Sequence, residues 1–309
     1  MWKYIIKRIL MLIPVLLGIS VFVFLIMHLT PGDPAMLILG EHAPPEQLEL
    51  LRKELGLDKR IEVQYWNWLK KAIRLDFGRS LRSNRPVTAI IAERLRYSAE
   101  LAVLAICLAV AVGVPVGIIS ATKPNSIQDN ILMVLALTGV AMPAFWQALI
   151  LIIVFSVYLG WLPPSGRMGG WEYYILPTIT LGTLSMASIA RMTRSSMLEV
   201  IQQDYIRTAK AKGLSHWIVV CRHALRNALI PVVTVIGLQF GSLMAGAVLT
   251  ETIFAWPGIG RLVVEAINNK DFPLVQGTIM TFALIYAVIN LIIDILYAYL
   301  DPKLRTIYE

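Results

Sequence analysis

The stretch DYIRTAKAKGLSHWIVVCRHALRNALIP, residues 204–231, is the longest polar interruption in the apolar second half of the chain. Asp204 suits the N-terminal cap of a helix, and Lys210 and Lys212 fall where cations favour the last turn of that helix. Gly213 then stands where a left-handed residue would end it. The pattern predicts a short capped helix.

A second helix is expected to follow this glycine, so that the stretch forms a helical hairpin. Ser215 can cap that second helix, which would run toward Pro231. The small side chains of the first helix, Thr208, Ala209 and Ala211, would let a groove of another protein close around it. A basic loop between membrane helices can also serve only to fix topology, and the residues by themselves leave both interpretations open.

The composition is that of an integral membrane protein. Of the 309 residues, 57% are hydrophobic and only 16% are charged, and the mean hydropathy is +0.67, whereas soluble domains are about 25% charged. The net charge of +8 does not indicate nucleic-acid binding, because the basic residues fall at helix ends and in loops and form no aromatic-laced face. Cys107 lies in an apolar run and Cys221 in the basic stretch, so a structural disulfide is not expected.

Apolar runs predict an all-α protein with six transmembrane helices, because a helix of about 20 apolar residues crosses the bilayer core. Pro143 is expected to kink the third of them. The predicted spans are residues 9–29, 101–121, 131–159, 175–190, 229–249 and 278–300.

The distribution of Lys and Arg predicts the orientation. An even number of spans places both termini on one side, and the short segments of that side hold most of the basic residues, the stretch 204–231 included. The short loops of the other side hold only Arg167, Arg261 and Lys270. By the positive-inside rule both termini and the basic hairpin are expected in the cytoplasm.

Between the first two spans we expect a small extracytoplasmic helical domain. Pro44 and Pro45 open an amphipathic helix that Gly56 closes, and a second helical pattern covers residues 63–75. Tyr65, Trp66 and Trp68 are expected to pack and not to bind a ligand. The predicted organisation is a transmembrane helix at 1–30, the extracytoplasmic domain at 31–97, and a five-helix core at 98–309 that contains the polar segment 191–228.

The stretch ETIFAWPGIG, residues 251–260, follows the fifth span and predicts a sharp irregular turn, because it combines a Pro-Gly pair with a further glycine. The span before it carries Gly237 and Gly241 on a small-residue face suited to helix packing. Three ionisable residues lie within or beside apolar runs, and pairing near the interface is expected for Glu100, Glu251 and Asp294.

These motifs resemble the permease subunits of binding-protein-dependent ABC importers, in particular the dipeptide, oligopeptide and nickel branch. The general loop pattern is Glu-Ala-Ala, three residues, then Gly, and this chain has Arg207-Thr208-Ala209 before Gly213, so the first two positions depart from it. The resemblance covers nearly the whole chain. It includes TPGDP (30–34), GLDKRIEVQYWNWL (56–69), DFGRSLRSNRPV (76–87), LPTITLGTLSMASIARMTRSSMLEV (176–200), HALRNALIP (223–231), ETIFAWPGIG (251–260) and DFPLVQG (271–277).

The resemblance implies a type I importer permease fold in a bacterial or archaeal cytoplasmic membrane, and a function as one half of the pathway for di- and oligopeptides. It implies a homologous second permease, two cytosolic ATPases and an extracytoplasmic substrate-binding protein as partners. The ATPase-coupling residues would be Asp204, Tyr205, Arg207, Thr208, Ala209, Lys210, Ala211, Lys212, Gly213 and Leu214. The residues of the outer gate or the translocation pathway would be Glu251, Phe254, Trp256, Pro257, Gly258, Gly260, Gly237 and Gly241.

The chain itself is not expected to be an enzyme. It lacks the GxxxxGK[ST] sequence, a catalytic triad and a metal-ligand pattern, so ATP and Mg²⁺ would be bound by the partner ATPases, and no cofactor or metal by this chain. The same machinery could import nickel, a metal chelate or glutathione instead of peptides. A stand-alone secondary transporter is a more distant alternative, since paired buried acids and broken inverted repeats are not evident.

Overall fold

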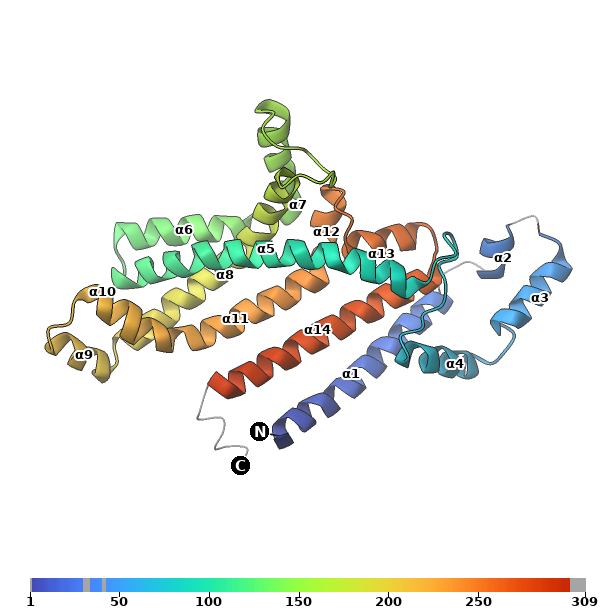
Figure 1. Ribbon diagram of the computed structural model, residues 1–309, viewed down its shortest axis with the longest axis horizontal. Coiled ribbons are helices and arrows are strands. Elements are labelled where there is room, and N and C mark those ends of the chain that lie inside the picture. The colour runs from blue at the N-terminus through green and yellow to red at the C-terminus, as the bar shows by residue number, and fades with distance from the viewer. Residues whose placement is uncertain (1, 30–33, 41–42, 301–309) are drawn as a thin grey trace.

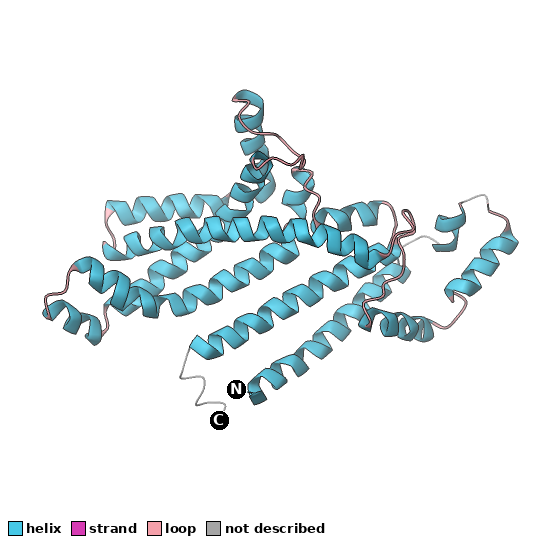
Figure 2. Ribbon diagram, viewed as in Figure 1, coloured by secondary structure: helices cyan, strands magenta, loops and turns pink. Residues whose placement is uncertain are grey.

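Helices form nearly all of the chain in a computed structural model, which describes residues 2–29, 34–40 and 43–300 (Figures 1 and 2). Within these residues the only β-type pairing is an isolated bridge between Arg79 and Pro86. The predicted turn that begins at Thr30 lies largely outside the described residues. The helices are α1 (Trp2–Leu29), α2 (Pro34–Leu39), α3 (Pro45–Leu55), α4 (Ile61–Ile73), α5 (Val87–Thr122), α6 (Ile127–Ala141), α7 (Ala144–Leu151), α8 (Glu172–Ile201), α9 (Asp204–Ala211), α10 (His216–Ile218), α11 (Leu225–Gly246), α12 (Val248–Ile253), α13 (Ile259–Asn268) and α14 (Phe272–Leu300), with π-helical turns η1 (Ile152–Tyr158) and η2 (Val219–Ala224).

Glycines bring α5 and α8 into direct backbone contact at the centre of the bundle. A Cβ atom added to Gly113 would lie 2.9 Å from the carbonyl oxygen of Met186, and one added to Gly117 would lie 2.6 Å from that of Ala190. Small residues at such positions let membrane helices approach closely. This pair forms the core against which α6 and α11 pack, while α14 packs on α11 and α1 packs on α14 (Figure 1).

The described helices include five that are long and apolar enough to cross a membrane, and a sixth crossing if a bent pair counts as one. In that pair α6 is followed by α7 and η1 at an angle of 100°. Met142 has the extended backbone that a residue before proline favours (φ −85°, ψ 131°), and Pro143 then precedes α7. The predicted kink at Pro143 is therefore a sharp break, and the predicted span 131–159 is two helices.

Two predicted boundaries are corrected by the structure. Helix α5 begins at Val87, well before the predicted span 101–121, and its 36 residues make it about 54 Å long. The second helix of the hairpin does not end near Pro231, because α10, η2 and α11 form one uninterrupted helical run from His216 to Gly246. The basic hairpin is thus made by one short helix and the extended end of a span.

The domain between α1 and α5 is helical, as predicted. Helix α3 ends at Gly56, which has the left-handed φ of 69° expected of a terminating glycine. Tyr65 and Trp68 of α4 pack against Phe24 of α1, with ring centroids 5.3 and 5.8 Å away, which confirms their predicted packing role. Trp66 instead is 55% exposed, under the ammonium group of Lys70.

The two ends of the bundle carry different elements. The start of α1 and the described end of α14 point toward the end that carries α9, and α13 lies at the opposite end (Figure 1); we refer to these as the α9 end and the α13 end. Arg8 of α1 and Asp294 of α14 form an ion pair of 3.0 Å, which confirms the predicted pairing of Asp294.

Candidate functional site

The α9 end presents a short helix with one buried and one exposed face. Ile206 and Ala209 are buried against a cluster that includes Met197 of α8 and Val220 of η2. This i, i+3 spacing puts both side chains on one side of the helix, so the rest of α9 faces outward. The exposed residues of the segment are Asp204, Tyr205, Arg207, Thr208, Lys210, Ala211, Lys212, Gly213 and Leu214.

Ala209 therefore differs from the other residues predicted to couple to a partner. Its side chain is only 6% exposed and supports α9 from within, so it is not available for direct contact. Asp204 also differs from expectation, because Gln203 occupies the N-cap position and Asp204 is the first helical residue. Its carboxylate still lies at the positive end of the helix dipole, and it pairs with Arg207 at 3.6 Å.

Gly213 ends this segment in the predicted manner. Its φ of +76° is left-handed, and its N–H donates to the carbonyl oxygen of Lys210. Ser215 then begins the next helical run with extended backbone, although its side chain accepts no capping hydrogen bond. Tyr205 fixes the hairpin from the other side, because its hydroxyl accepts a hydrogen bond of 2.8 Å from the Asn227 amide.

An ion pair ties this end of the bundle together and was not predicted from sequence. The guanidinium of Arg194 in α8 makes two hydrogen bonds of 2.8 and 2.7 Å to the buried carboxylate of Asp129 in α6. Asp129 also accepts from the backbone N–H of Asn125. Because α8 leads to α9 through only Gln202 and Gln203, α9 is mechanically linked to α6 as well as to α8 and α11.

At the α13 end, the irregular turn is built around a buried carboxylate. Glu251 is fully buried, and its oxygens accept hydrogen bonds from the Ser98 hydroxyl (2.5 Å) and from the backbone N–H groups of Gly260 (2.7 Å) and Arg261 (3.0 Å). Ser98 in turn accepts from the N–H of Ile259 at 2.8 Å. The carboxylate thus caps the start of α13 and fastens it to α5, which confirms that Glu251 is paired.

Burial raises the pKa of Glu251, while the hydrogen bonds from Ser98, Arg261 and Gly260 and the charge of Arg94 lower it without offsetting the burial. The two glycines of the turn are required by this carboxylate. A Cβ atom at Gly258 would lie 2.3 Å from the Glu251 carboxyl group, and one at Gly260 would lie 2.9 Å from its Oε2 and 2.8 Å from the Cα of Val248.

The aromatic residues of the turn are also buried. Phe254 is 1% and Trp256 is 0% exposed, and the Trp256 indole N–H donates to the carbonyl oxygen of Tyr97 at 3.0 Å. Ala255 between them has a positive φ of 48°. Pro257 follows as the residue before Gly258, so the whole stretch 251–260 is a packed turn joining α12, α13 and α5.

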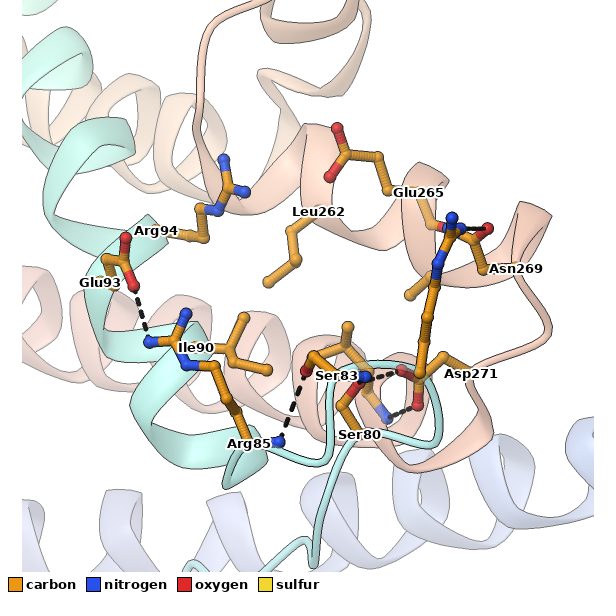
Figure 3. A pocket seen from close by; sticks show the side chains of 13 residues that line it. Ser80, Ser83, Arg85, Ile90, Glu93, Arg94, Leu262, Glu265, Asn269 and Asp271 are labelled. Atoms are coloured by element: carbon orange, nitrogen blue, oxygen red, sulfur yellow. Dashed lines mark hydrogen bonds and ion pairs between the residues drawn. The ribbon is translucent and has the colours of Figure 1, made fainter. Parts of the chain in front are cut away.

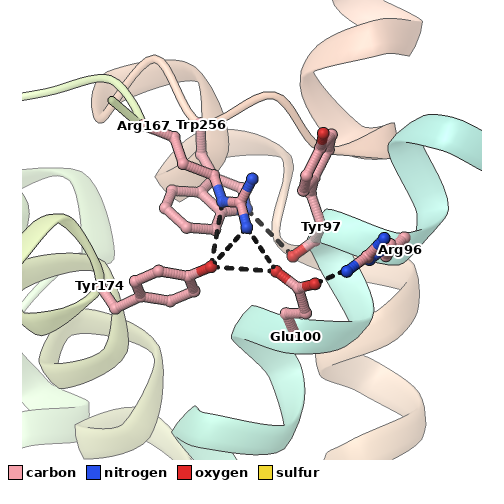
Figure 4. A network of polar contacts seen from close by, with 6 residues as sticks. All are labelled: Arg96, Tyr97, Glu100, Arg167, Tyr174 and Trp256. Atoms are coloured by element: carbon pink, nitrogen blue, oxygen red, sulfur yellow. Dashed lines mark hydrogen bonds and ion pairs between the residues drawn. The ribbon is translucent and has the colours of Figure 1, made fainter. Parts of the chain in front are cut away.

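A polar network beside this turn involves Arg167, which lies between η1 and α8 (Figure 4). Its guanidinium donates to Glu100 at 3.0 Å and to the Tyr174 hydroxyl at 2.7 Å. It also lies 4.3 Å from the ring centroid of Tyr97 and 5.7 Å from that of Trp256, within cation–π range. Glu100 is therefore paired as predicted, and the loop before α8 is pinned to α5.

Gly237 and Gly241 do not take part in this turn. Cβ atoms at these positions would lie 2.6 Å from Cγ1 of Ile293 and 3.1 Å from Cγ2 of Ile289, both on α14. These two glycines of α11 therefore pack against α14, which confirms the small-residue packing face predicted for this span, and their role at the outer gate or pathway stays a prediction.

Sequence reasoning missed Ser98, Arg167 and the pair of Asp129 with Arg194. Ser98 lies 153 residues from Glu251 in the chain, and no local pattern links the two. Asp129 gave a weak signal, because an acidic residue in the first turn after Ser126 is typical of a capped helix, and the Ser126 side chain does accept from the Asp129 N–H.

Two family models match this chain. Residues 113–306 match the inner membrane component of binding-protein-dependent transport systems, and residues 1–102 match the N-terminal part of such membrane components.

Curated relatives are similar along almost the whole chain. The dipeptide transport system permease protein DppB of Alkalihalophilus pseudofirmus is 47% identical over 332 residues, covering 99% of this chain and 100% of the relative. The glutathione transport system permease protein GsiC of Escherichia coli K12 is 46% identical over 305 residues, covering 99% of each.

Solved structures share the fold. A chain of the methionine ABC transporter MetNI, in inward-facing conformations, aligns with a TM-score of 0.59 at 16% identity over 69% of this chain and 96% of that one. A chain of an amino acid ABC transporter aligns with a TM-score of 0.51 at 14% identity over 71% of this chain and 94% of that one. The fold is that of the type I importer permeases. The chain belongs to the family of inner membrane components of binding-protein-dependent transport systems, and it is a permease subunit of an ABC importer and not an enzyme.

Proposed function

We propose that the chain forms half of the translocation pathway of an ATP-driven importer for di- and oligopeptides. Its partners in this proposal are a homologous second permease, two cytosolic ATPases that bind ATP and Mg²⁺, and an extracytoplasmic substrate-binding protein. The observation that carries the proposal is the exposed face of α9, which is held out from the bundle by Ile206 and Ala209. A short helix with one free polar face suits insertion into a groove of a soluble partner.

The α9 end faces the cytoplasm in this proposal, with both termini on the same side. Support comes from the basic residues of α9 and of the turn after it, Arg207, Lys210 and Lys212, because such residues are retained on the cytoplasmic side in short loops. The α13 end then faces outward, and so does the domain formed by α2, α3 and α4.

Coupling would work through rigid elements. An ATPase that grips the exposed face of α9 and moves would displace α8 through Gln202 and Gln203, α11 through η2, and α6 through the Asp129–Arg194 pair. Each of these links joins packed helices, so movement at α9 would change the packing of the bundle.

The turn 251–260 would lie beside the outer gate. The contacts of Glu251, Trp256 and Arg167 support this placement, because together they join α5, α12, α13 and the loop before α8. A movement of this end must therefore either break these contacts or move the joined elements together. We propose that Arg167 holds the loop before α8 in place while the outer end is closed.

The cargo follows from the relatives and not from the fold. A relative of 47% identity is a dipeptide permease, which favours peptides. Relatives at 46% identity are glutathione permeases, and glutathione is itself a small peptide, so it is the second candidate. Nickel or a metal chelate is a further alternative, because the sequence resemblance extends to that branch.

The test is reconstitution of the complex recovered with the tagged chain from its native membrane. Recovery of a sister permease and ATPases, with ATP-dependent uptake of labelled dipeptide in proteoliposomes, is expected. Competition by glutathione and by nickel at matched concentrations ranks the cargoes. A chain that purifies without any ATPase, or that transports without ATP, would refute the proposed coupling and favour a secondary transporter.

A further inference from the structure

A cleft of about 390 Å³ opens at the α13 end, between the loop before α5, the first turns of α5, and α13 (Figure 3). Its floor is apolar, with buried side chains of Ile90, Leu262 and Leu274. Its walls carry charged and amide side chains from all three elements. A ligand in the cleft would therefore touch α5 and α13 at the same time.

The acidic groups of the cleft are already engaged. Asp271 is buried and accepts from the Ser80 hydroxyl at 2.5 Å and from the N–H of Leu81 at 3.1 Å. Glu93 pairs with Arg85 at 3.0 Å. Glu265 pairs at 2.8 Å with Arg261, which does not line the cleft.

Two guanidinium groups that line the cleft form no ion pair with a residue that the structure describes. Arg94 lines the cleft from α5 and is half-buried. Its charge acts on the nearby buried carboxylate of Glu251, but it makes no hydrogen bond or ion pair to a described residue. Arg82 lines it from the loop and donates only to the neutral amide oxygen of Asn269. Arginine matches a carboxylate by two parallel hydrogen bonds, so this cleft has the chemistry to take a carboxylate.

The position of the cleft relative to the bilayer indicates the side from which a carboxylate reaches it. Helix α5 is about 54 Å long, whereas the hydrocarbon core is about 30 Å thick. Its charged residues, Glu93, Arg94, Arg96 and Glu100, all lie in its first turns, so these turns are the part that projects beyond the bilayer. Arg94 lies on these turns, and Arg82 lies on the loop that precedes them. In the orientation proposed above, a ligand reaches this cleft from the outer surface.

We propose that the cleft between Arg82 and Arg94 takes an acidic side chain of the extracytoplasmic binding protein. This rests on the proposed function, and it deepens it by naming the residues that receive the partner. Because α13 is fastened to α5 through Glu251, an acidic side chain in the cleft would contact the same two helices that the turn 251–260 joins.

The experiment uses the intact reconstituted importer and the binding protein recovered with it, and it measures ATPase stimulation against binding-protein concentration. Arg94→Glu and Arg82→Glu are each expected to raise the half-saturating concentration by about 10-fold or more, since like charges then meet across the contact. Arg74→Glu is the matched control, because Arg74 is exposed at the end of α4 and does not line the cleft. It is expected to behave as the native chain.

A milder variant keeps the test decisive if Arg94→Glu fails to assemble. Arg94→Gln removes the charge alone, and the increase in half-saturating concentration with added salt should be smaller for it than for the native chain. Equal values for the native chain, Arg94→Gln and the control would overturn the inference. The inference would also be overturned if Arg94→Gln changed how ATPase stimulation depends on cargo concentration at saturating binding protein, while its half-saturating concentration of binding protein stayed native. If the native importer itself shows no stimulation by any binding protein, the proposed function fails instead.

Discussion

Replacing Glu251 tests whether the turn at the α13 end is built around its carboxylate. Glu251→Ala would leave three donors without their acceptor: the buried Ser98 hydroxyl, the buried N–H of Gly260 and the partly buried N–H of Arg261. An unsatisfied buried group costs about 1–3 kcal/mol, so the two buried donors together cost about 2–6 kcal/mol. The upper end of that range is comparable with the whole stability of many proteins, about 5–15 kcal/mol.

Glu251→Gln is the matched control. Its amide oxygen can still accept from Gly260 and Arg261, and its NH₂ group can donate to the Ser98 oxygen, so the expected loss is about 1 kcal/mol. The purified complex of each variant would be compared by thermal unfolding and by hydrogen exchange over residues 251–261. The start of α13 is expected to exchange fast in the Ala variant and slowly in the Gln variant. Native-like exchange and an unchanged unfolding temperature in Glu251→Ala would refute the role given to this carboxylate.

Three further predictions follow from single positions. Gly213→Val is expected to destabilise the turn after α9 by about 1–2 kcal/mol and to lower ATP-dependent uptake, because the φ of +76° is left-handed while the space around a Cβ is open. Gly213→Asn should retain most uptake, because asparagine tolerates this backbone conformation. Equal uptake by the two variants would contradict this prediction. Gly117→Ala is expected to destabilise the complex by about 1–3 kcal/mol in thermal unfolding, since the added Cβ would lie 2.6 Å from the Ala190 carbonyl oxygen. Gly18→Ala is the control and should be neutral, because a Cβ added at Gly18 would have no atom within 4 Å. Burial raises the pKa of Glu251 in the folded chain, so the stability that this shift contributes is fully present below the ordinary pKa of a glutamate and is lost as the pH rises through the raised value. The unfolding temperature of the native complex, relative to that of Glu251→Gln, should therefore fall with rising pH. A rise would contradict the assigned direction of the pKa shift.

Local features were predictable from the sequence because their causes are local. Gly213 and Gly56 end helices where a left-handed residue was expected, and Pro143 breaks the third apolar run. The buried face of α9 could also have been predicted, since Ile206 and Ala209 are three residues apart on a short polar helix. A count of small residues alone did not distinguish the buried Ala209 from the exposed Thr208.

Long-range partners could not be predicted in the same way. The Glu251 carboxylate meets Ser98 of α5, and Arg167 meets Glu100, 67 residues away in the chain. These pairs depend on how α5, α8 and α13 are placed in space, and a single sequence carries no record of that placement. Likewise, the start of α5 at Val87 was hidden because its first turns are polar, as suits a helix that projects beyond the bilayer.

In the proposed function, the exposed face of α9 docks on an ATPase. It is tested most directly by cysteine cross-linking in the assembled importer, after replacement of the exposed Cys107 and Cys221. Thr208→Cys lies on the exposed face and Ala209→Cys on the buried face, one residue apart, so they form a matched pair. A cross-link to the ATPase subunit is expected from position 208 and little or none from position 209, with a yield from position 208 that changes when ATP is added. Absence of an ATPase cross-link from position 208, or equal yields from both positions, would contradict it.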